Sequence, residues 1–217
     1  IDYFPNSAEA LYRPLRLPPD AAERRQLPAG FCIMFAGNIG AAQDFETIIG
    51  AAAQLRDHPA IHWIVLGDGR LFGWVKAEVE KQGLQRTFHL LGRQPLETMP
   101  RYFALADAML VTLKKEPIFA LTIPAKVQSY LACARPMVAA LDGEGARVIE
   151  ESGAGLGVPT ENPAALAGTV LAMYKMTPEE RMAMGNRGRE YFERHFERGI
   201  LLRRLDGWIR ELKQEAA

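Results

Sequence analysis

The chain has 217 residues, with 26 Lys and Arg residues against 26 Asp and Glu residues, and 48% of its residues are hydrophobic. A chain of this length can bury a substantial core without a disulfide or a metal ion. Its zero formal charge gives no general field for nucleic acid or an anionic membrane, which argues against both as nonspecific partners. No apolar run reaches about 18 residues and no signal-peptide pattern opens the chain, so we expect no transmembrane segment in it.

The first thirty residues resemble a linker. They begin with Ile1 rather than Met and contain Pro14, Pro18, Pro19 and Pro28. Prolines at this density interrupt both helical and strand periodicity. We therefore expect a fragment of a longer protein that starts at an interdomain linker over residues 1–30.

From residue 31 onward, short apolar runs alternate with segments of helical periodicity. The expected strands cover residues 31–36, 61–66, 87–91, 108–113, 136–141 and 154–158. Their near-continuous apolar character is typical of parallel strands that are covered on both faces. The alternation predicts an α/β fold with a Rossmann-like, doubly wound, parallel six-stranded sheet in a domain over residues 31–176.

Three helices with clear start signals are expected after the last strand. Asn162 is an N-cap followed by Pro at the first helical position, and Thr177 with Glu180 forms a capping box. Residues 177–217 are therefore predicted to form a C-terminal helical extension. Its last helix has an apolar stripe that needs a partner surface, made of Leu201, Leu205, Trp208 and Leu212.

Candidate binding residues lie in the loops that follow the strands, because ligands of doubly wound sheets bind at the carboxyl ends of the strands. The first loop contains Gly37 and Gly40, and the second contains Gly67 and Gly69. Glycines let backbone N–H groups approach an anion closely. The set of loops indicates a nucleotide diphosphate site, although a tight strand end explains each single loop equally well.

The segment around Pro124 predicts the start of a helix. Pro suits the first turn, and Val127 and Tyr130 would lie on the buried face. The amides near Ala125 and Lys126 would then be free to bind a phosphate at the positive end of the helix. Lys126 would add a formal charge to that site; the alternative is a solvated lysine, which the helix dipole disfavours in a first turn.

The spacing of other residues excludes several kinds of site. Residues 37–43 follow a G-x-x-G-x-x-Q pattern, and no acidic residue ends the second strand, which argues against a nicotinamide cofactor. The four histidines show no metal-ligand spacing, and the two cysteines, Cys32 and Cys133, are expected to be buried and reduced. Asp142 and Glu144 fit a loop before a helix better than a metal site. We expect no metal ion and no cofactor.

Several motifs together resemble the C-terminal half of family 4 glycosyltransferases, across nearly the whole chain. They are Pro5-Asn6, Phe35-Ala-Gly-Asn-Ile-Gly40, Gly67-Asp-Gly69, Ala106-Asp107, Pro124-Ala-Lys126 and Tyr130-Leu-Ala-Cys-Ala-Arg-Pro136. The likeness is closest to bacterial O-antigen and capsule enzymes of the fucosamine-transferase type. It implies a GT-B fold, in which this half binds the nucleotide-sugar donor and an N-terminal domain binds the acceptor. The last helix would then pack on that N-terminal domain.

The resemblance also implies which residues form the site, with two departures. Relatives place Arg and Lys after the first strand, where this chain has Asn38, Ile39 and Gln43. Relatives place two Glu residues where this chain has Leu121 and Ser129, so we take Glu116 as a substitute for the first. The predicted catalytic residues are Glu116 and Lys126. The predicted donor-binding residues are Gly37, Asn38, Ile39, Gly40, Gln43, Gly67, Asp68, Gly69, Arg93, Thr122, Ile123, Pro124, Ala125, Lys126 and Ser129.

The resemblance implies a retaining, metal-independent glycosyltransferase of bacterial surface-polysaccharide synthesis. The donor would be a UDP-sugar with an N-acetylhexosamine, and the acceptor a lipid-linked or saccharide molecule bound through the absent N-terminal domain. The fragment alone is expected to be inactive. The full-length protein is expected in the cytoplasm, or at the inner face of the cell membrane. A nucleotide-sugar 2-epimerase of GT-B fold and a catalytically inactive nucleotide-binding module are the alternatives.

Overall fold

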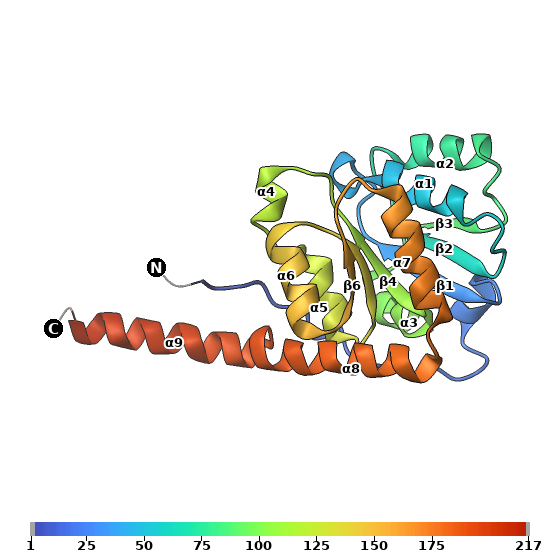
Figure 1. The fold of residues 1–217 in the computed structure, drawn as a ribbon. Helices are drawn as coiled ribbons and strands as arrows, with labels where there is room; N and C mark the ends of the chain where they lie inside the picture. Colours follow the sequence, from blue (N-terminus) through green and yellow to red (C-terminus); the bar gives the residue numbers. More distant parts are fainter. Residues whose placement is uncertain (1–2, 216–217) are drawn as a thin grey trace.

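The computed structural model describes residues 3–215 and contains one six-stranded sheet (Figure 1). All neighbouring strands are parallel, in the order β3-β2-β1-β4-β5-β6. The strands are β1 (Phe31–Ala36), β2 (Ile61–Leu66), β3 (Phe88–Gly92), β4 (Ala108–Thr112), β5 (Met137–Ala140) and β6 (Gly155–Val158). The sequence prediction of a doubly wound parallel sheet is therefore confirmed.

Helices cover both faces of the sheet, which explains why its central strands are apolar throughout. One hydrophobic cluster lies between the sheet and α1 (Phe45–Gln54), α2 (Phe72–Lys81) and α7 (Pro163–Lys175). A second lies between the sheet and α3 (Met99–Leu105), α5 (Ala125–Ala132), α6 (Gly143–Ser152) and α8 (Pro178–His195). Every residue of β1, β2, β4 and β5 is buried. Such strands are typical of a parallel sheet enclosed between two helical layers.

Four short elements lie in the connections. They are η1 (Ala22–Gln26), η2 (Ala41–Gln43), η3 (Leu96–Thr98) and α4 (Pro117–Ala120). Of these, η2, η3 and α4 follow the carboxyl ends of β1, β3 and β4 respectively. They therefore shape the edge of the sheet at which a ligand is expected.

The N-terminal segment, residues 3–30, packs on the domain. Ala8 is buried beside the α3 and α5 side of the sheet. Glu23 accepts two hydrogen bonds from the Arg101 guanidinium, at 2.6 and 3.0 Å. The Tyr102 hydroxyl donates to Gln26 Oε1 at 2.9 Å. These contacts fix a proline-rich stretch that has no strand and only one short helical turn among its described residues.

The helical extension begins with the expected capping box. The Glu180 amide donates to the Thr177 hydroxyl at 3.1 Å, and the Thr177 amide donates to the Glu180 carboxylate at 2.7 Å. Helix α9 (Arg198–Glu215) then projects away from the sheet (Figure 1). Leu201 is 3% exposed, whereas Leu205 is 38% and Leu212 is 65% exposed. Leu205 and Leu212 are therefore open to solvent, whereas the half-buried Trp208 packs edge-on against Phe4, with ring centroids 6.1 Å apart.

Within residues 3–215, no helix combines the length and the apolar composition that crossing a bilayer requires.

Candidate active site

Two glycine loops pack against each other at the carboxyl ends of β1 and β2. Gly67 has a φ of +144°, and a Cβ atom on it would overlap the Gly37 carbonyl oxygen. A Cβ atom on Gly69 would lie 2.5 Å from the Ile39 carbonyl oxygen. The Gly37 amide donates to the Leu66 carbonyl at 2.9 Å. These positions need glycine because the two backbones approach too closely for any side chain.

Among the described residues, the first loop has two unpaired amides, one on exposed Asn38 and one on buried Gly40. The Ile39 amide donates to the Asp68 carbonyl at 2.9 Å, which fixes the loop conformation. The amides of Asn38 and Gly40 form no hydrogen bond within residues 3–215. Free amides on a rigid glycine loop form a concavity that suits an anion.

The first turn of α5 faces the same region. Pro124 is its N-cap residue, and no side chain caps the helix. The first amides of a helix have no partner inside the helix, so those of Ala125 and Lys126 are available to a ligand. The aligned peptide dipoles also give this end partial positive charge. The structure therefore brings the predicted helix N-terminus to the glycine loop.

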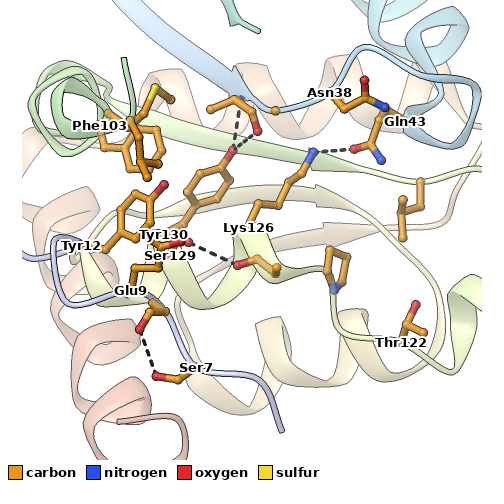
Figure 2. A pocket seen from close by; sticks show the side chains of 18 of the residues that line it. Ser7, Glu9, Tyr12, Asn38, Gln43, Phe103, Thr122, Lys126, Ser129 and Tyr130 are labelled. Atoms are coloured by element: carbon orange, nitrogen blue, oxygen red, sulfur yellow. Dashed lines mark hydrogen bonds between the residues drawn. The ribbon is translucent and has the colours of Figure 1, made fainter. Parts of the chain in front are cut away.

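Lys126 occupies the space between these two elements (Figure 2). Its Nζ donates to Gln43 Oε1 at 2.5 Å and lies 3.8 Å from the centroid of the Phe35 ring. The ammonium also lies next to Gly37, where an added Cβ would be 3.5 Å from Nζ. Burial lowers the pKa of Lys126 to about 7. No carboxylate among the described residues forms an ion pair with it. Its charge is thus available to an anion.

Two hydrogen-bonded contacts hold the walls of this site. Thr112, at the end of β4, donates through its hydroxyl to the Gln43 carbonyl at 2.5 Å. The Tyr130 hydroxyl, on α5, accepts from the Ala36 amide at 3.1 Å and lies 3.2 Å from the Ala36 carbonyl oxygen. Burial raises the pKa of Tyr130 well above its usual range, so the phenol stays neutral. Gln43 and α5 are therefore fixed relative to β1.

These groups line one cavity of about 660 Å³, which we call the donor cavity because eight of the predicted donor-binding residues line it. The N-terminal segment forms one of its walls through Ser7, Ala8, Glu9 and Tyr12 (Figure 2). The Tyr12 ring stacks on Phe103, with centroids 5.7 Å apart and planes 9° apart. The sequence predicts residues 1–30 only as a linker, so this wall was not expected. No periodicity or motif in this segment points to it.

A second cavity of about 400 Å³ adjoins the donor cavity and shares Gly37, Asn38 and Met99 with it. It is lined by the second glycine loop and by Arg93 and Gln94, which follow β3. The Arg93 side chain is exposed. The predicted donor-binding residue Arg93 therefore lines this second cavity.

Glu116 lies in a third cavity, of about 390 Å³, and not in the lining of the donor cavity. Lys115, Asp142 and Thr160 line the same space, and the Thr160 hydroxyl donates to Asp142 at 2.7 Å. The third cavity shares only Leu113 and Phe119 with the donor cavity. Glu116 and Lys126 thus line different cavities, which the sequence did not predict.

The other predicted residues divide among three places. Those lining the donor cavity are Gly37, Asn38, Gln43, Thr122, Pro124, Ala125, Lys126 and Ser129. Those lining the second cavity are Gly67, Asp68, Gly69 and Arg93. Ile39 and Gly40 are buried residues of the first loop and line neither cavity. Ile123 also lines neither cavity. Leu121 is 74% exposed.

Within residues 3–215, no group of three His, Cys, Asp or Glu side chains is arranged to hold a metal ion. His62 and His89 lie on adjacent strands, with Nδ1 and Nε2 separated by 3.2 Å. The second ring nitrogen of His62 lies 3.1 Å from the Ala29 carbonyl oxygen. This pair is far along the strands from the glycine loops and serves the packing of β2 and β3.

Residues 30–176 match the family described as glycosyl transferases group 1. The chain belongs to this family. It is 28% identical over 184 residues to the probable glycosyltransferase WbjE of Pseudomonas aeruginosa, a match covering 84% of this chain and 44% of WbjE. It is 32% identical over 135 residues to the putative colanic acid biosynthesis glycosyl transferase WcaI of Escherichia coli K12, covering 61% of this chain and 30% of WcaI. The chain thus spans less than half the length of these curated relatives.

Solved structures show the same fold. A glycosyltransferase from Rickettsia africae superposes with a TM-score of 0.79 at 16% identity, covering 95% of this chain and 55% of that one. Anabaena HepE in complex with UDP-glucose gives a TM-score of 0.77 at 17% identity, covering 95% of this chain and 56% of HepE. The C-terminal domain of LpcC from Francisella tularensis gives a TM-score of 0.70 at 17% identity, and the match covers 87% of this chain and 97% of the LpcC domain. The chain therefore has the Rossmann-like fold of the C-terminal half of GT-B proteins.

Proposed function

We propose that this chain is the donor-binding domain of a retaining glycosyltransferase that uses a UDP-sugar. The observation that supports it best is the convergence, in one cavity, of the Lys126 ammonium, the free amides of the first glycine loop and the first turn of α5. A diphosphate is the ligand that such a set of donors suits. HepE and Staphylococcus aureus TarM, two structural neighbours, were crystallised with UDP.

The same donors would assist departure of the diphosphate during sugar transfer. Negative charge develops on the bridging oxygen as the bond to the sugar breaks, and fixed N–H groups and an ammonium stabilise that charge. Lys126 would give the charge that a divalent cation gives in metal-dependent enzymes. We propose a metal-independent reaction on this basis. Glu116 would act on the donor sugar only if the sugar reaches past Phe119 into the third cavity.

The wider role follows from the relatives. WcaI is described as a colanic acid biosynthesis enzyme, which supports a place in bacterial surface-polysaccharide synthesis, including O-antigen or capsule. We propose an N-acetylhexosamine as the transferred sugar and a lipid-linked or saccharide molecule as the acceptor. Residues 1–30 would link to an acceptor domain, and the last helix, α9, would pack on that domain. The full protein would work in the cytoplasm, at the inner face of the membrane, and the 217-residue chain alone would not turn over donor.

Calorimetric titration of UDP tests the proposal. We expect UDP to bind with the same affinity in the presence of EDTA and of excess magnesium. UMP should bind more weakly, because it lacks the second phosphate that reaches Lys126 and α5. Absence of UDP binding would refute a donor-binding role. Binding that disappears with EDTA would refute only the metal-independent mechanism.

A further inference from the structure

The N-terminal segment brings a carboxylate to one end of the donor cavity. Glu9 and Tyr12 both line the cavity, as does Ser129 on α5 (Figure 2). The Tyr12 amide donates to the Glu9 carbonyl at 3.0 Å, which forms a turn between the two side chains. Ala8, the neighbour of Glu9, is 8% exposed and anchors the segment to the domain. The backbone at Glu9 is thus held by the fold, and its side chain is exposed at the edge of the cavity.

The three polar side chains affect one another. Burial raises the pKa of Tyr12, the negative charge of Glu9 raises it further, and the nearby Ser129 side chain lowers it. The Ser129 hydroxyl also lies 3.3 Å from the Ala125 carbonyl oxygen, to which it donates. A serine that donates its proton in this way keeps lone pairs free to accept from a ligand.

No cationic side chain among residues 3–215 neutralises the charge of Glu9. Its carboxylate forms no ion pair and no hydrogen bond within the described part of the chain, residues 3–215. Two free carboxylate oxygens can each accept a hydrogen bond, and two adjacent hydroxyls can donate both at once. A carboxylate in this setting suits a vicinal diol and repels a phosphate.

The distance along α5 relates this end of the cavity to the phosphate site. Ser129 lies four residues after Ala125 and three after Lys126, so the three residues share one face of the helix. Four residues of α-helix rise about 6 Å. In a nucleoside diphosphate, the ribose hydroxyls stand a few bonds from the first phosphate. A nucleoside diphosphate held at the first turn of α5, with its nucleoside directed toward Ser129, would have its ribose beside that residue.

We propose that Glu9, with Ser129 and Tyr12, forms a subsite for the vicinal ribose diol of the nucleotide, and that Glu9 accepts hydrogen bonds from it. This inference rests on the proposed donor-binding function. It assigns to the N-terminal segment a direct part in recognising ribonucleotides.

The test compares UDP with 2′,3′-dideoxy-UDP by calorimetry, in the unchanged chain and in Glu9→Gln. We expect the unchanged chain to bind UDP about ten-fold or more tightly than the dideoxy compound, because hydrogen bonds to a charged acceptor are strong. In Glu9→Gln this ratio should fall to about two-fold or three-fold, mainly because UDP binds less well. Inorganic pyrophosphate, which has no diol, should bind no more weakly to the variant.

The matched control is Glu80→Gln, which removes an exposed carboxylate on α2, outside both cavities. It should keep the full preference for UDP. Thermal melting should show that both variants fold like the unchanged chain.

Three results would overturn the inference in distinguishable ways. Equal binding of UDP and dideoxy-UDP by the unchanged chain would show that no diol subsite exists, while leaving the donor-binding role intact. An equal loss of affinity for both compounds in Glu9→Gln would show that Glu9 supports the shape of the cavity and does not bind the diol. Failure of UDP to bind the unchanged chain would refute the proposed function, and this inference with it.

Discussion

The Lys126 ammonium donates to Gln43 Oε1 across the gap between α5 and η2, at 2.5 Å. In most lysine environments a carboxylate or water balances the charge, but here a neutral amide and the Phe35 ring are its neighbours. Without an anion the charge of the Lys126 amine is poorly compensated, so the amine is only partly protonated near pH 7. Burial lowers the pKa of Lys126 to about 7 for the same reason.

This relationship predicts how stability depends on pH. Between pH 7 and about 10.5, the unfolded chain keeps a proton on Lys126 that the folded chain releases. The free energy of unfolding should therefore rise with pH in this window, by about 1.4 kcal/mol per pH unit at most. Lys126→Met keeps the apolar stem over Phe35 and removes the titration. Urea unfolding of both proteins at pH 7.0 and 8.5 should show this rise only in the unchanged chain. An equal change in the free energy of unfolding in both proteins would contradict the prediction.

Donor affinity should depend more on Lys126 than on Ser129. Lys126→Ala should weaken UDP binding about ten- to a hundred-fold, since a charge-assisted hydrogen bond contributes about 1.5–3 kcal/mol. Ser129→Ala should lose about 1 kcal/mol, because its hydroxyl is neutral. Calorimetry gives both values. If Lys126→Ala left UDP binding intact and lowered the melting temperature instead, the lysine would be structural.

Gln43 should tolerate a neutral replacement better than an acidic one. Gln43→Glu would place a carboxylate beside Lys126 and in the path of the diphosphate, so UDP affinity should fall at least about ten-fold. Gln43→Leu removes only the amide contact and should have a smaller effect. The reverse order in a UDP titration would mean that Gln43 binds the donor through its own amide N–H groups.

Gly67 should be the least replaceable glycine of the site. Gly67→Ala would force a Cβ into the Gly37 carbonyl at a φ of +144°, which should cost about 2 kcal/mol or more and disturb both loops. Gly73 lies in α2 with no atom within 4 Å of an added Cβ. Gly73→Ala should be neutral or stabilising by about 0.5–1 kcal/mol, since Ala favours a helix. Chemical unfolding of the two variants gives the comparison.

The exposed stripe on α9 should cause self-association of the 217-residue chain. Leu205, Ile209 and Leu212 are 38%, 44% and 65% exposed on one projecting helix. Large exposed apolar patches seldom persist on monomers. Light scattering should give a mass that rises with concentration, and Leu205→Glu combined with Leu212→Glu should return it to the monomer value. A concentration-independent monomer mass before substitution would contradict this expectation.

The sequence by itself determined the architecture, because periodicity and capping are local. Apolar runs at 31–36 and 61–66 became β1 and β2 with unchanged limits. The Thr177 capping box formed as expected, since both of its partners lie within one turn. The glycine loops and Pro124 were also found at the predicted edge of the sheet, because parallel strands bring their carboxyl ends together.

Only the tertiary structure decided which side chains share a cavity. Glu9 and Tyr12 line the donor cavity although they lie more than a hundred residues from Lys126 in the chain, since burial of Ala8 and stacking on Phe103 fold the segment back. Glu116, close to Lys126 in sequence, lines another cavity. Such placements depend on packing between distant segments, which no local pattern of residues records.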